Sequence, residues 1–574
     1  MKPKLRIARL LLGILLPCAF REALAQELYL SWATTFGHPA NANQFEFGPP
    51  ILLSDTNGDT RLFGQCHGGK GTFRLGTNVF PATIINGIEN QDLYMARLDS
   101  RGNPVSVKLL PSTGRVDANA LGAAMDPAGN VILVLGTSAA GVSGSTLAGT
   151  SLPAAGGLAM VKVDANDEVV WANMVGGRVD SLTPGGLTVR SVAVDWNGNV
   201  LIGGCFQGLY SLDGFILDAT GGGIRDVFVA KFSPDGGLLW VRTAGGVEPP
   251  GVYQTDWVEG VATDSAGNVF IGGTIVNGAS FDGRIVSTVG DYDVFAARYS
   301  PDGDLDWVFT TDTARFQGLR VGRDDKPILV DVSFDISGAT LLRLTVLDNS
   351  GQPVSALPPV LTSPGNGVSW IPFVGMEVGE ANELLLIASV FPAATLQFGG
   401  ETLSIGPGEE RLVFGGSLNL DGTWNWLRPI ARPHYATNAT AERYFLPGPY
   451  AWPEMRGFAA SRGALRFAGV YLSPEPFPMA NGTLPASARY DSQFFVAEIA
   501  VKPSPPRLAI TGSGSSLNLA WPSSVTNFVL QSATMLANGG DWQDSNLTPT
   551  ETGSQHVVTV SATNRAAFFR LRGP

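Results

Sequence analysis

The chain has 574 residues, a formal net charge of −12 and 15% charged residues. This length exceeds one ordinary domain core and suits a large repeat fold with a smaller module. The acidic balance argues against nucleic acid and anionic lipid as partners, because neither is bound without a basic surface. With 71 Gly, 38 Pro and 44% hydrophobic residues, the chain is turn-rich but not disordered.

The first residues have the pattern of an export signal. Four basic residues precede the apolar run 10–20, and Ala23 and Ala25 stand at the small-residue cleavage positions. We expect residues 1–25 to be a signal peptide and the mature protein to be secreted or at the cell surface. The apolar run is too short to span a bilayer. No later segment predicts membrane insertion.

Two cysteines, Cys66 and Cys205, remain after the expected cleavage. An exported protein can form a disulfide. These two cysteines, however, occupy similar places in repeats that are not neighbours. We therefore expect two separate free thiols.

One turn, Asp-x-x-Gly-Asn, recurs at Asp126, Asp195 and Asp264, with a spacing of 69 residues each time. An apolar segment precedes each turn and a β-rich run follows it, which predicts a hairpin whose Gly and Asn supply positive φ. A second hairpin follows, exemplified by "DVFVAKFSPDGGLLW" at 226–240. Each unit therefore holds four antiparallel strands. Such a unit cannot bury both faces alone and must stack on its neighbours, as a propeller blade does.

Weaker copies of the first turn bring the number of expected blades to seven. They are expected to begin near residues 43, 117, 187, 256, 315, 368 and 455. The last copy has no tryptophan-bearing strand, but "LYLSWATTFG" at 28–37 resembles "GLLWVRTAGG" at 237–246. We infer that the N-terminal strand completes the last blade and closes the ring, which removes exposed sheet edges.

The end of the chain reads as a linker and a small β module. "KPSPP" at 502–506 favours extended chain. Short alternating strands follow in 507–574, as expected for an antiparallel β-sandwich. The predicted fold is all-β: a seven-bladed β-propeller over 26–501, closed by the N-terminal strand, and a C-terminal β-sandwich.

The repeat, with "DSAGNVFIGGT" and "DVFAARYSPDGDLDW", resembles the seven-bladed bacterial propeller (SBBP) repeat of secreted and cell-surface proteins. The tail "LAWPSSVTNFVLQSATMLANGGDWQ" looks like a module that ends many exported multidomain bacterial proteins. The resemblance implies a scaffold or binding role and supplies no catalytic motif. "SPDGGLLW" also looks like the tryptophan-docking repeat of quinoprotein dehydrogenases, but the signatures of their cofactor sites are not apparent, so we expect no cofactor.

Motifs for catalysis and metal binding do not emerge. The histidines form no pair at metal-ligand spacing, and there is neither a phosphate loop nor a nucleophile elbow. The run "DTNGDT" at 55–60 starts like a calcium loop but lacks its later glutamate, so we interpret it as a hairpin turn. Recurring Asp and Lys or Arg positions on the third strands are interpreted as repeated structural bonds. The recurring tryptophans are interpreted as packing between blades. We expect no catalytic residue and no metal.

The connection at 432–455 does not repeat, and it is rich in aromatic residues. Connections between blades open on one face of a propeller, where aromatic platforms with polar groups suit sugar rings or peptides. The alternative is a self-packed loop that plugs the channel mouth. Further candidates are expected on the same face, near the entry of first strands. The candidate ligand-binding residues are Tyr435, Tyr444, Tyr450, Trp452, Trp257, Asp256 and Arg190.

The function that this pattern favours is non-catalytic binding or scaffolding outside the cytoplasm. The expected partner is a polysaccharide or another extracellular protein, and the protein is expected to be a monomer. One alternative is an extracellular glycan hydrolase or lyase with its site at the channel mouth, which would need converging titratable groups with perturbed pKa values. Another is a structural spacer whose C-terminal module serves attachment or sorting.

Overall fold

The computed structural model describes the parts of the chain that form its sheets and most of their turns. These are residues 28–37, 50–55, 57–67, 72–75, 78–81, 84–85, 88–89, 91–114, 116–138, 144–153, 156–179, 186–219, 225–245, 256–276, 279–286, 293–311, 315–334, 339–354, 357, 359, 361–363, 373–390, 395–398, 401–404, 412–431, 444–447, 458–461, 464–472, 476–485, 493–501, 508–513, 516–522, 529–533, 542–552, 555–561 and 568–572. The chain divides into two compact units, 1–501 and 502–574.

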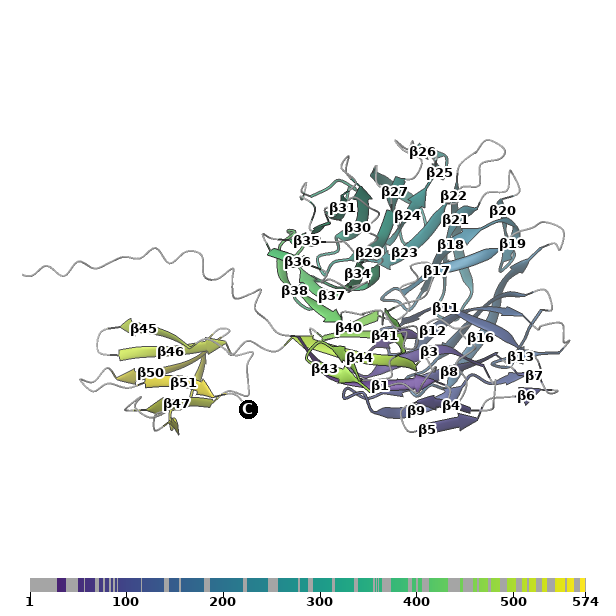
Figure 1. The fold of residues 1–574 in the computed structure, drawn as a ribbon. Coiled ribbons are helices and arrows are strands. Elements are labelled where there is room, and N and C mark those ends of the chain that lie inside the picture. Colours follow the sequence, from purple (N-terminus) through teal and green to yellow (C-terminus); the bar gives the residue numbers. More distant parts are fainter. Residues whose placement is uncertain are drawn as a thin grey trace, which may run out of the picture. The chain divides into compact units, whose positions relative to one another are not determined.

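The larger unit is built from four-stranded antiparallel sheets that follow one another along the chain, and one parallel pair, Asp117 opposite Gln91, joins the first two (Figure 1). The first four have the strands β2 (Ile51–Ser54), β3 (Thr60–His67), β8 (Gln91–Leu98) and β9 (Pro104–Leu109); β11 (Asp117–Met125), β12 (Val131–Ser138), β15 (Gly157–Val163) and β16 (Val169–Arg178); β17 (Leu187–Val194), β18 (Val200–Phe206), β21 (Asp226–Phe232) and β22 (Leu238–Gly245); and β23 (Trp257–Thr263), β24 (Val269–Ile275), β27 (Asp293–Tyr299) and β28 (Leu305–Thr311).

The remaining sheets of this unit repeat the same arrangement. They have the strands β29 (Arg315–Val321), β30 (Pro327–Phe334), β31 (Thr340–Val346) and β32 (Leu361–Ser363); β33 (Phe373–Val378), β34 (Leu384–Val390), β37 (Leu412–Leu418) and β38 (Trp424–Ala431); and β40 (Phe458–Ser461), β41 (Ala464–Leu472), β44 (Gln493–Val501) and β1 (Leu28–Gly37).

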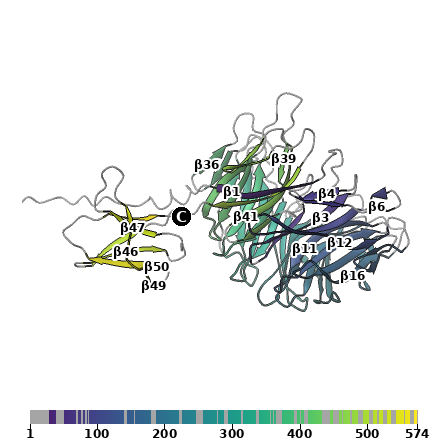
Figure 2. The same cartoon turned by 90° about the horizontal axis from the view of Figure 1, so that it is seen from below.

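The first strands of these sheets form a ring. In the order β2, β11, β17, β23, β29, β33 and β40, each contacts the next, and β40 contacts β2. Sheets that stand side by side with their first strands inward make a β-propeller (Figures 1 and 2). We call each of these sheets a blade.

The N-terminal strand β1 joins the two ends of the propeller. It pairs antiparallel with β44, from Leu28 opposite Val501 to Phe36 opposite Phe494. This pairing confirms the expectation that 28–37 supplies the outer strand of the last blade. Because the last blade is built from both ends of the unit, neither end leaves an unpaired first or last sheet.

Buried aliphatic and aromatic side chains hold adjacent blades together. One cluster combines Leu201 and Val229 of the β17 blade with Ile271 and Phe295 of the β23 blade, each at most 1% exposed. Second and third strands carry these side chains in unbroken apolar runs, because both faces of a blade are covered by neighbours. The propeller core therefore lies between blades rather than within one.

Extra hairpins cover the outer edges of several blades, as Figure 1 shows at the rim. Each lies in the chain between the second and third strands of one blade and pairs with the outermost strand of the preceding blade. They are β4 (Thr72–Leu75) with β5 (Asn78–Pro81) on β1, β19 (Gly208–Leu212) with β20 (Phe215–Ala219) on β16, β25 (Ala279–Phe281) with β26 (Arg284–Val286) on β22, and β35 (Thr395–Phe398) with β36 (Glu401–Ser404) on β32.

The tips of two of these hairpins show why the chain can turn there. Asp213 and Gly214 have φ of 44° and 88°, and Asp282 and Gly283 have φ of 47° and 83°. Two successive positive φ values are the requirement of the tight hairpin turn that Asp-Gly favours. The hairpins thus protect sheet edges that would otherwise face solvent, and they account for repeats as long as 69 residues.

Smaller strands complete the described structure. In the larger unit they are β6 (Ile84–Ile85), β7 (Ile88–Glu89), β10 (Ser112–Thr113), β13 (Thr146–Leu147), β14 (Thr150–Ser151), β39 (Tyr444–Pro447), β42 (Phe477–Met479) and β43 (Gly482–Leu484). No helix long and apolar enough to cross a membrane occurs among the described residues.

The smaller unit consists of two antiparallel sheets. One contains β45 (Ala509–Ser513), β46 (Ser516–Pro522), β50 (Gln555–Ser561) and β49 (Thr550–Thr552); the other contains β48 (Gln543–Asp544), β47 (Val529–Ala533) and β51 (Phe568–Arg572). Leu519 and Trp521 of the first sheet are buried with Leu530 of the second. The two sheets therefore share one apolar core.

Candidate functional site

Charged residues at repeated positions form the same ion pair in successive blades. In the β17 blade, the Lys231 ammonium on the third strand lies 3.1 Å from the buried Asp195 carboxylate at the first turn. Lys162 and Asp126 make the same 3.1 Å pair in the preceding blade. The same bond in successive blades supports the structural interpretation of these charges.

The tryptophans on the outer strands dock onto the next blade. Trp240 donates from Nε1 to the Pro301 carbonyl at 3.0 Å, and Trp307 donates to the Asn349 carbonyl at 3.0 Å. The turn glycines Gly303 and Gly351 have positive φ, and a Cβ on either would lie within 2.9 Å of the indole. The prediction that these tryptophans pack between blades is confirmed.

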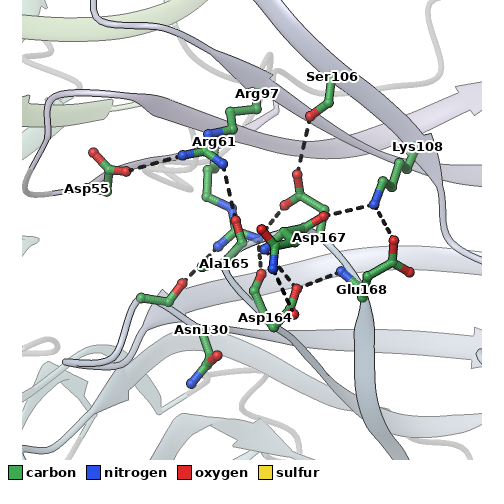
Figure 3. Close-up of polar contacts among 12 residues, drawn as sticks. Asp55, Arg61, Arg97, Ser106, Lys108, Asn130, Asp164, Ala165, Asp167 and Glu168 are labelled. Carbon is green, nitrogen blue, oxygen red and sulfur yellow. Dashed lines mark hydrogen bonds and ion pairs between the residues drawn. The ribbon is translucent and has the colours of Figure 1, made fainter.

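The contact between the β2 blade and the β11 blade has polar side chains in place of a docking tryptophan, as Figure 3 shows. Ser106 on β9 occupies the position of the docking tryptophan in other blades. In the turn between β15 and β16 of the next blade, Asp167 occupies the position that is glycine in other blades, and its φ is 62°. The Ser106 hydroxyl lies 3.4 Å from the Asp167 carboxylate, which also pairs with buried Arg61. Arg61 donates to the Gly129 and Asp164 carbonyls at 3.0 and 2.9 Å. An ionic joint thus takes the place of the indole.

Each blade has two hairpin turns, one between its first and second strands and one between its third and fourth strands. Both turns lie at the same end of the blade, because the cation on the third strand reaches the first turn. The chain enters the first strands at the opposite end, which we call the entry end. Asp256 and Trp257 stand at the entry of β23, and Arg190 is the fourth residue of β17. Tyr435, Tyr450 and Trp452 lie outside the described residues. For Tyr444 only the backbone is described, at the start of β39, where it pairs with Leu472.

The structure brings two of the predicted residues together at the entry end. The guanidinium carbon of Arg190 lies 4.5 Å from the centroid of the Trp257 ring, within cation–π range. Arg225, immediately before β21, places its guanidinium 5.0 Å from the same ring. One indole from β23 thus holds two cations from the preceding blade.

Asp256 has a different role from its neighbour Trp257. Its side chain is 1% exposed, and one carboxylate oxygen accepts a 2.9 Å hydrogen bond from the Val276 amide at the end of β24. Its own amide donates to the Arg225 carbonyl at 3.2 Å. These bonds fix the entry of β23 next to Arg225, so the observed contacts of Asp256 position the cluster. Direct ligand binding by Asp256 stays a prediction.

Glu259 completes the cluster and was not predicted from the sequence. Burial raises the pKa of its carboxyl to about 7, although the charges of Arg190 and Arg315 oppose the rise. Arg315 stands at the entry of β29 and is exposed, whereas Glu259 is partly exposed. A carboxyl with this pKa exchanges its proton near neutral pH.

Register shifts explain why Arg190 and Glu259 occupy related places. The first strands β11, β17, β23, β29 and β33 contain a β-bulge at the same position of the repeat, and the bulged residues are Leu121, Arg190, Glu259, Gln317 and Val374. A bulge re-aims one side chain and is common beside functional sites. Polar residues occupy this position in three consecutive blades, from β17 to β29. The sequence signal was available, because 121, 190 and 259 differ by 69.

Cys205 lies beside this cluster but is closed off. It is free and fully buried at the end of β18, and burial raises the pKa of its thiol to about 11 against the opposing charges of Arg225 and Arg190. Such a thiol is chemically inert. The expectation of a free thiol is confirmed for Cys205, while the side chain of Cys66 lies outside the described residues.

Comparisons with known proteins give structural similarities at low scores only. No protein-family model matches the chain, and no curated protein matches it. Similar solved structures include the Dos1 propeller, with 9% identity over 79% of this chain and 95% of that chain and a TM-score of 0.33. They also include the β-propeller domain of the Trilobed protease from Pyrococcus furiosus, with 9% identity over 65% and 96% and a TM-score of 0.24.

A glucose dehydrogenase is similar at 12% identity over 53% of this chain and 96% of that chain, with a TM-score of 0.24. Scores this low carry no argument about fold or activity. The sheet topology itself defines the class: the chain contains a β-propeller.

Proposed function

We propose that the protein is a secreted, non-catalytic binding protein that recognises a polysaccharide through the entry end of a seven-bladed propeller. In this proposal residues 1–25 direct export, the mature protein is a monomer, and 507–574 form a β-sandwich. The pattern at 1–25 and the resemblance of the repeat to secreted propeller proteins support the extracellular location.

The observation that carries the proposal is the cluster around Trp257. The guanidinium groups of Arg190 and Arg225, both from the β17 blade, lie 4.5 and 5.0 Å from the centroid of the Trp257 indole. Trp257 belongs to the adjoining β23 blade. The structural bonds between blades recur from repeat to repeat, but Trp257 and Arg190 have different residues at the matching positions of the preceding blade, Thr188 and Leu121. Side chains that interrupt a repeat in this way are typical of a recognition site.

A second candidate, an extracellular glycan lyase or hydrolase, is favoured by one observation. The pKa of about 7 at Glu259 suits a general base, and the nearby guanidinium groups could neutralise a substrate carboxylate. Hydrolysis by the usual mechanism needs two carboxyl groups placed across the glycosidic bond. The neighbouring carboxylate, Asp256, instead accepts the Val276 amide bond. Binding therefore remains the better-supported function.

The experiment measures binding of residues 26–574 to a polysaccharide panel by calorimetry while the solution is analysed for released products. Trp257→Ala and Arg190→Gln should each weaken binding. Trp196→Ala is the matched control, because Trp196 is 70% exposed in the first turn of the β17 blade, at the other end. The triple variant at Tyr444, Tyr450 and Trp452 tests the connection 432–455.

Each outcome selects one function. Binding that is lost in Trp257→Ala but kept in Trp196→Ala, with no product, supports the proposal. Released product would instead establish the enzyme. If no polysaccharide binds, the ligand is another extracellular protein or the propeller is a spacer. Following export and surface attachment after deletion of 507–574 would then test the spacer.

A further inference from the structure

The smaller unit differs in charge from the rest of the chain. Residues 502–574 contain five basic and three acidic residues, so their formal net charge is +2, whereas the whole chain has −12. Two of the basic residues, Arg570 and Arg572, stand on β51, an edge strand of its sheet. A local excess of positive charge on an acidic protein favours an anionic ligand at that place.

Both arginines lie on the outer face of this sheet. Successive side chains of a strand point to opposite faces, and Leu571, between the two arginines, packs against the apolar core of the unit. Arg570 and Arg572 are exposed. In the register of the sheet, Arg570 stands opposite Gln531 of β47, and Gln531 stands opposite Asp544 of β48. These three residues therefore form one row across the outer face.

Two contacts hold the Arg570 guanidinium in a fixed orientation. Its central carbon lies 4.3 Å from the centroid of the Trp542 ring, within cation–π range. Its Nε donates a 2.8 Å hydrogen bond to Oε1 of Gln531, a residue that is 4% exposed. Gln531 in turn donates from Nε2 to the Asp544 carboxylate at 2.8 Å. The two terminal amino groups of Arg570 make no hydrogen bond to any described residue, so they can donate to a ligand.

Arg572 already binds a carboxylate on this face. One of its terminal nitrogens lies 3.1 Å from Asp544 Oδ2, and about half of each side chain is exposed. Among the described residues of this sheet Asp544 is the only acidic one, so one carboxylate faces the two arginines. Glu551 belongs to the other sheet, and Asp541 lies outside the described residues. An exposed ion pair is weak, so a ligand carboxylate can share or replace Asp544.

We propose that the outer face of β47, β48 and β51 is a second binding site, which takes the carboxylates of an acidic polysaccharide. Arg570 and Arg572 are the contacts, and Trp542 and Gln531 orient Arg570. A guanidinium presents a planar fork of donors that matches a carboxylate. The two arginines are two residues apart on one strand, which puts their Cα atoms about 6.6 Å apart. Neighbouring charges of one polymer can therefore be bound together.

The small number of cations favours a polysaccharide over other anionic partners. Binding to an anionic membrane is typical of clusters of roughly four to eight basic residues. Nucleic acid binding likewise depends on many phosphate contacts. The described part of this face offers two arginines and one acidic residue. Two oriented guanidinium groups instead suit carboxylates that repeat along a sugar chain, because each sugar needs only one contact.

The test measures binding of residues 26–574 by calorimetry, with polygalacturonate as the acidic probe and dextran as the neutral probe. Arg570→Gln and Arg572→Gln should each weaken polygalacturonate binding about tenfold, the order of a lost hydrogen bond to a charged group. Arg570→Lys keeps the charge but loses the fork, so it should weaken binding nearly as much. Arg284→Gln, at an exposed position of β26, removes the same charge from the propeller and should leave binding unchanged. Trp257→Ala should also leave it unchanged.

The outcomes separate this inference from the proposed function. Polygalacturonate binding that is weakened in the Arg570 and Arg572 variants but kept in Trp257→Ala supports the inference. Binding that is lost in Trp257→Ala but kept in Arg570→Gln would overturn it and support the propeller site. Circular dichroism of each variant confirms folding.

Other results would also overturn the inference. If Arg284→Gln weakens binding as much as Arg570→Gln, or if Arg570→Lys has no effect, the attraction is nonspecific. If dextran binds as tightly as polygalacturonate, the carboxylates are not recognised. Binding to vesicles that contain phosphatidylglycerol, without binding to polygalacturonate, would point to a membrane. Failure of polygalacturonate to bind would leave the wider polysaccharide panel to decide the proposed function.

Discussion

Removal of one docking tryptophan should destabilise the propeller measurably. Trp307 is 6% exposed, lies 6.1 Å from the Phe270 ring, and covers the backbone of Gly351 in the next blade. Trp307→Ala would leave a cavity between two blades. Truncation of a buried Trp typically costs about 3–5 kcal/mol. We expect a loss of this size in the free energy of unfolding.

Trp307→Phe separates packing from hydrogen bonding. It keeps a ring in the joint but removes the donor to the Asn349 carbonyl. Arg298 donates to the same carbonyl at 3.2 Å, so that acceptor stays bonded. The loss should be about 1 kcal/mol.

The assay is guanidinium-induced unfolding of the full mature chain, followed by far-ultraviolet circular dichroism, and the midpoint and slope of each variant's own transition give its free energy of unfolding. The larger transition, from the propeller, gives the difference between variants. If Trp307→Ala costs less than about 1 kcal/mol, or if Trp307→Phe costs as much as Trp307→Ala, the proposed docking role is wrong.

Further predictions concern single residues of the propeller. Arg61→Ala should cost about 3–5 kcal/mol because it leaves a buried carboxylate without its cation, whereas Lys108→Ala, at an exposed pair of the same joint, should cost under about 1 kcal/mol in the same unfolding assay. Burial acts to raise the pKa of Asp195, but hydrogen bonds from its turn and from the lysine on the third strand outweigh burial and lower the pKa. The Asp195 carboxylate therefore stabilises the fold above its unfolded pKa of about 3.9. This stabilisation is lost as pH falls through the lowered pKa of the folded state. The urea midpoint of unfolding of Asp195→Asn should thus differ from that of the native protein more at pH 7 than at pH 3. In a Cys66→Ser background, Cys205 should not react with a disulfide reagent at pH 8 in the native state, where a pKa of about 11 leaves about one thiol in a thousand ionised, and it should react fully in denaturant.

Much of the fold could be predicted because the repeat encodes it locally. The Asp-x-x-Gly-Asn turns and the tryptophan strands are contiguous patterns, and they predict the hairpins, the blade order and the role of β1. The covering hairpins were missed for a physical reason. "YSLDGFILD" at 210–218 carries a clear hairpin signal, but its partner β16 belongs to the preceding blade, and no local pattern identifies a distant partner.

The site was predicted only in part. Trp257 and Arg190 were predicted from their expected place near the entry of first strands, but Glu259, Arg225 and Arg315 were not predicted. Their meeting depends on ring geometry, which brings the entry of β29 and the start of β21 next to β23. The replacement of tryptophan and glycine by Ser106 and Asp167 was likewise invisible, because each residue looks ordinary within its own blade. The replacement is explained only by the structure, in which Arg61 of the neighbouring blade pairs with Asp167.

The most direct test of ligand recognition at the entry end is a crystal structure of the mature protein with an oligosaccharide from a polysaccharide that it binds. The account predicts that the sugar contacts Trp257 or the Arg190 guanidinium. A ligand bound only at the turn end of the blades, or only on residues 508–572, would contradict it.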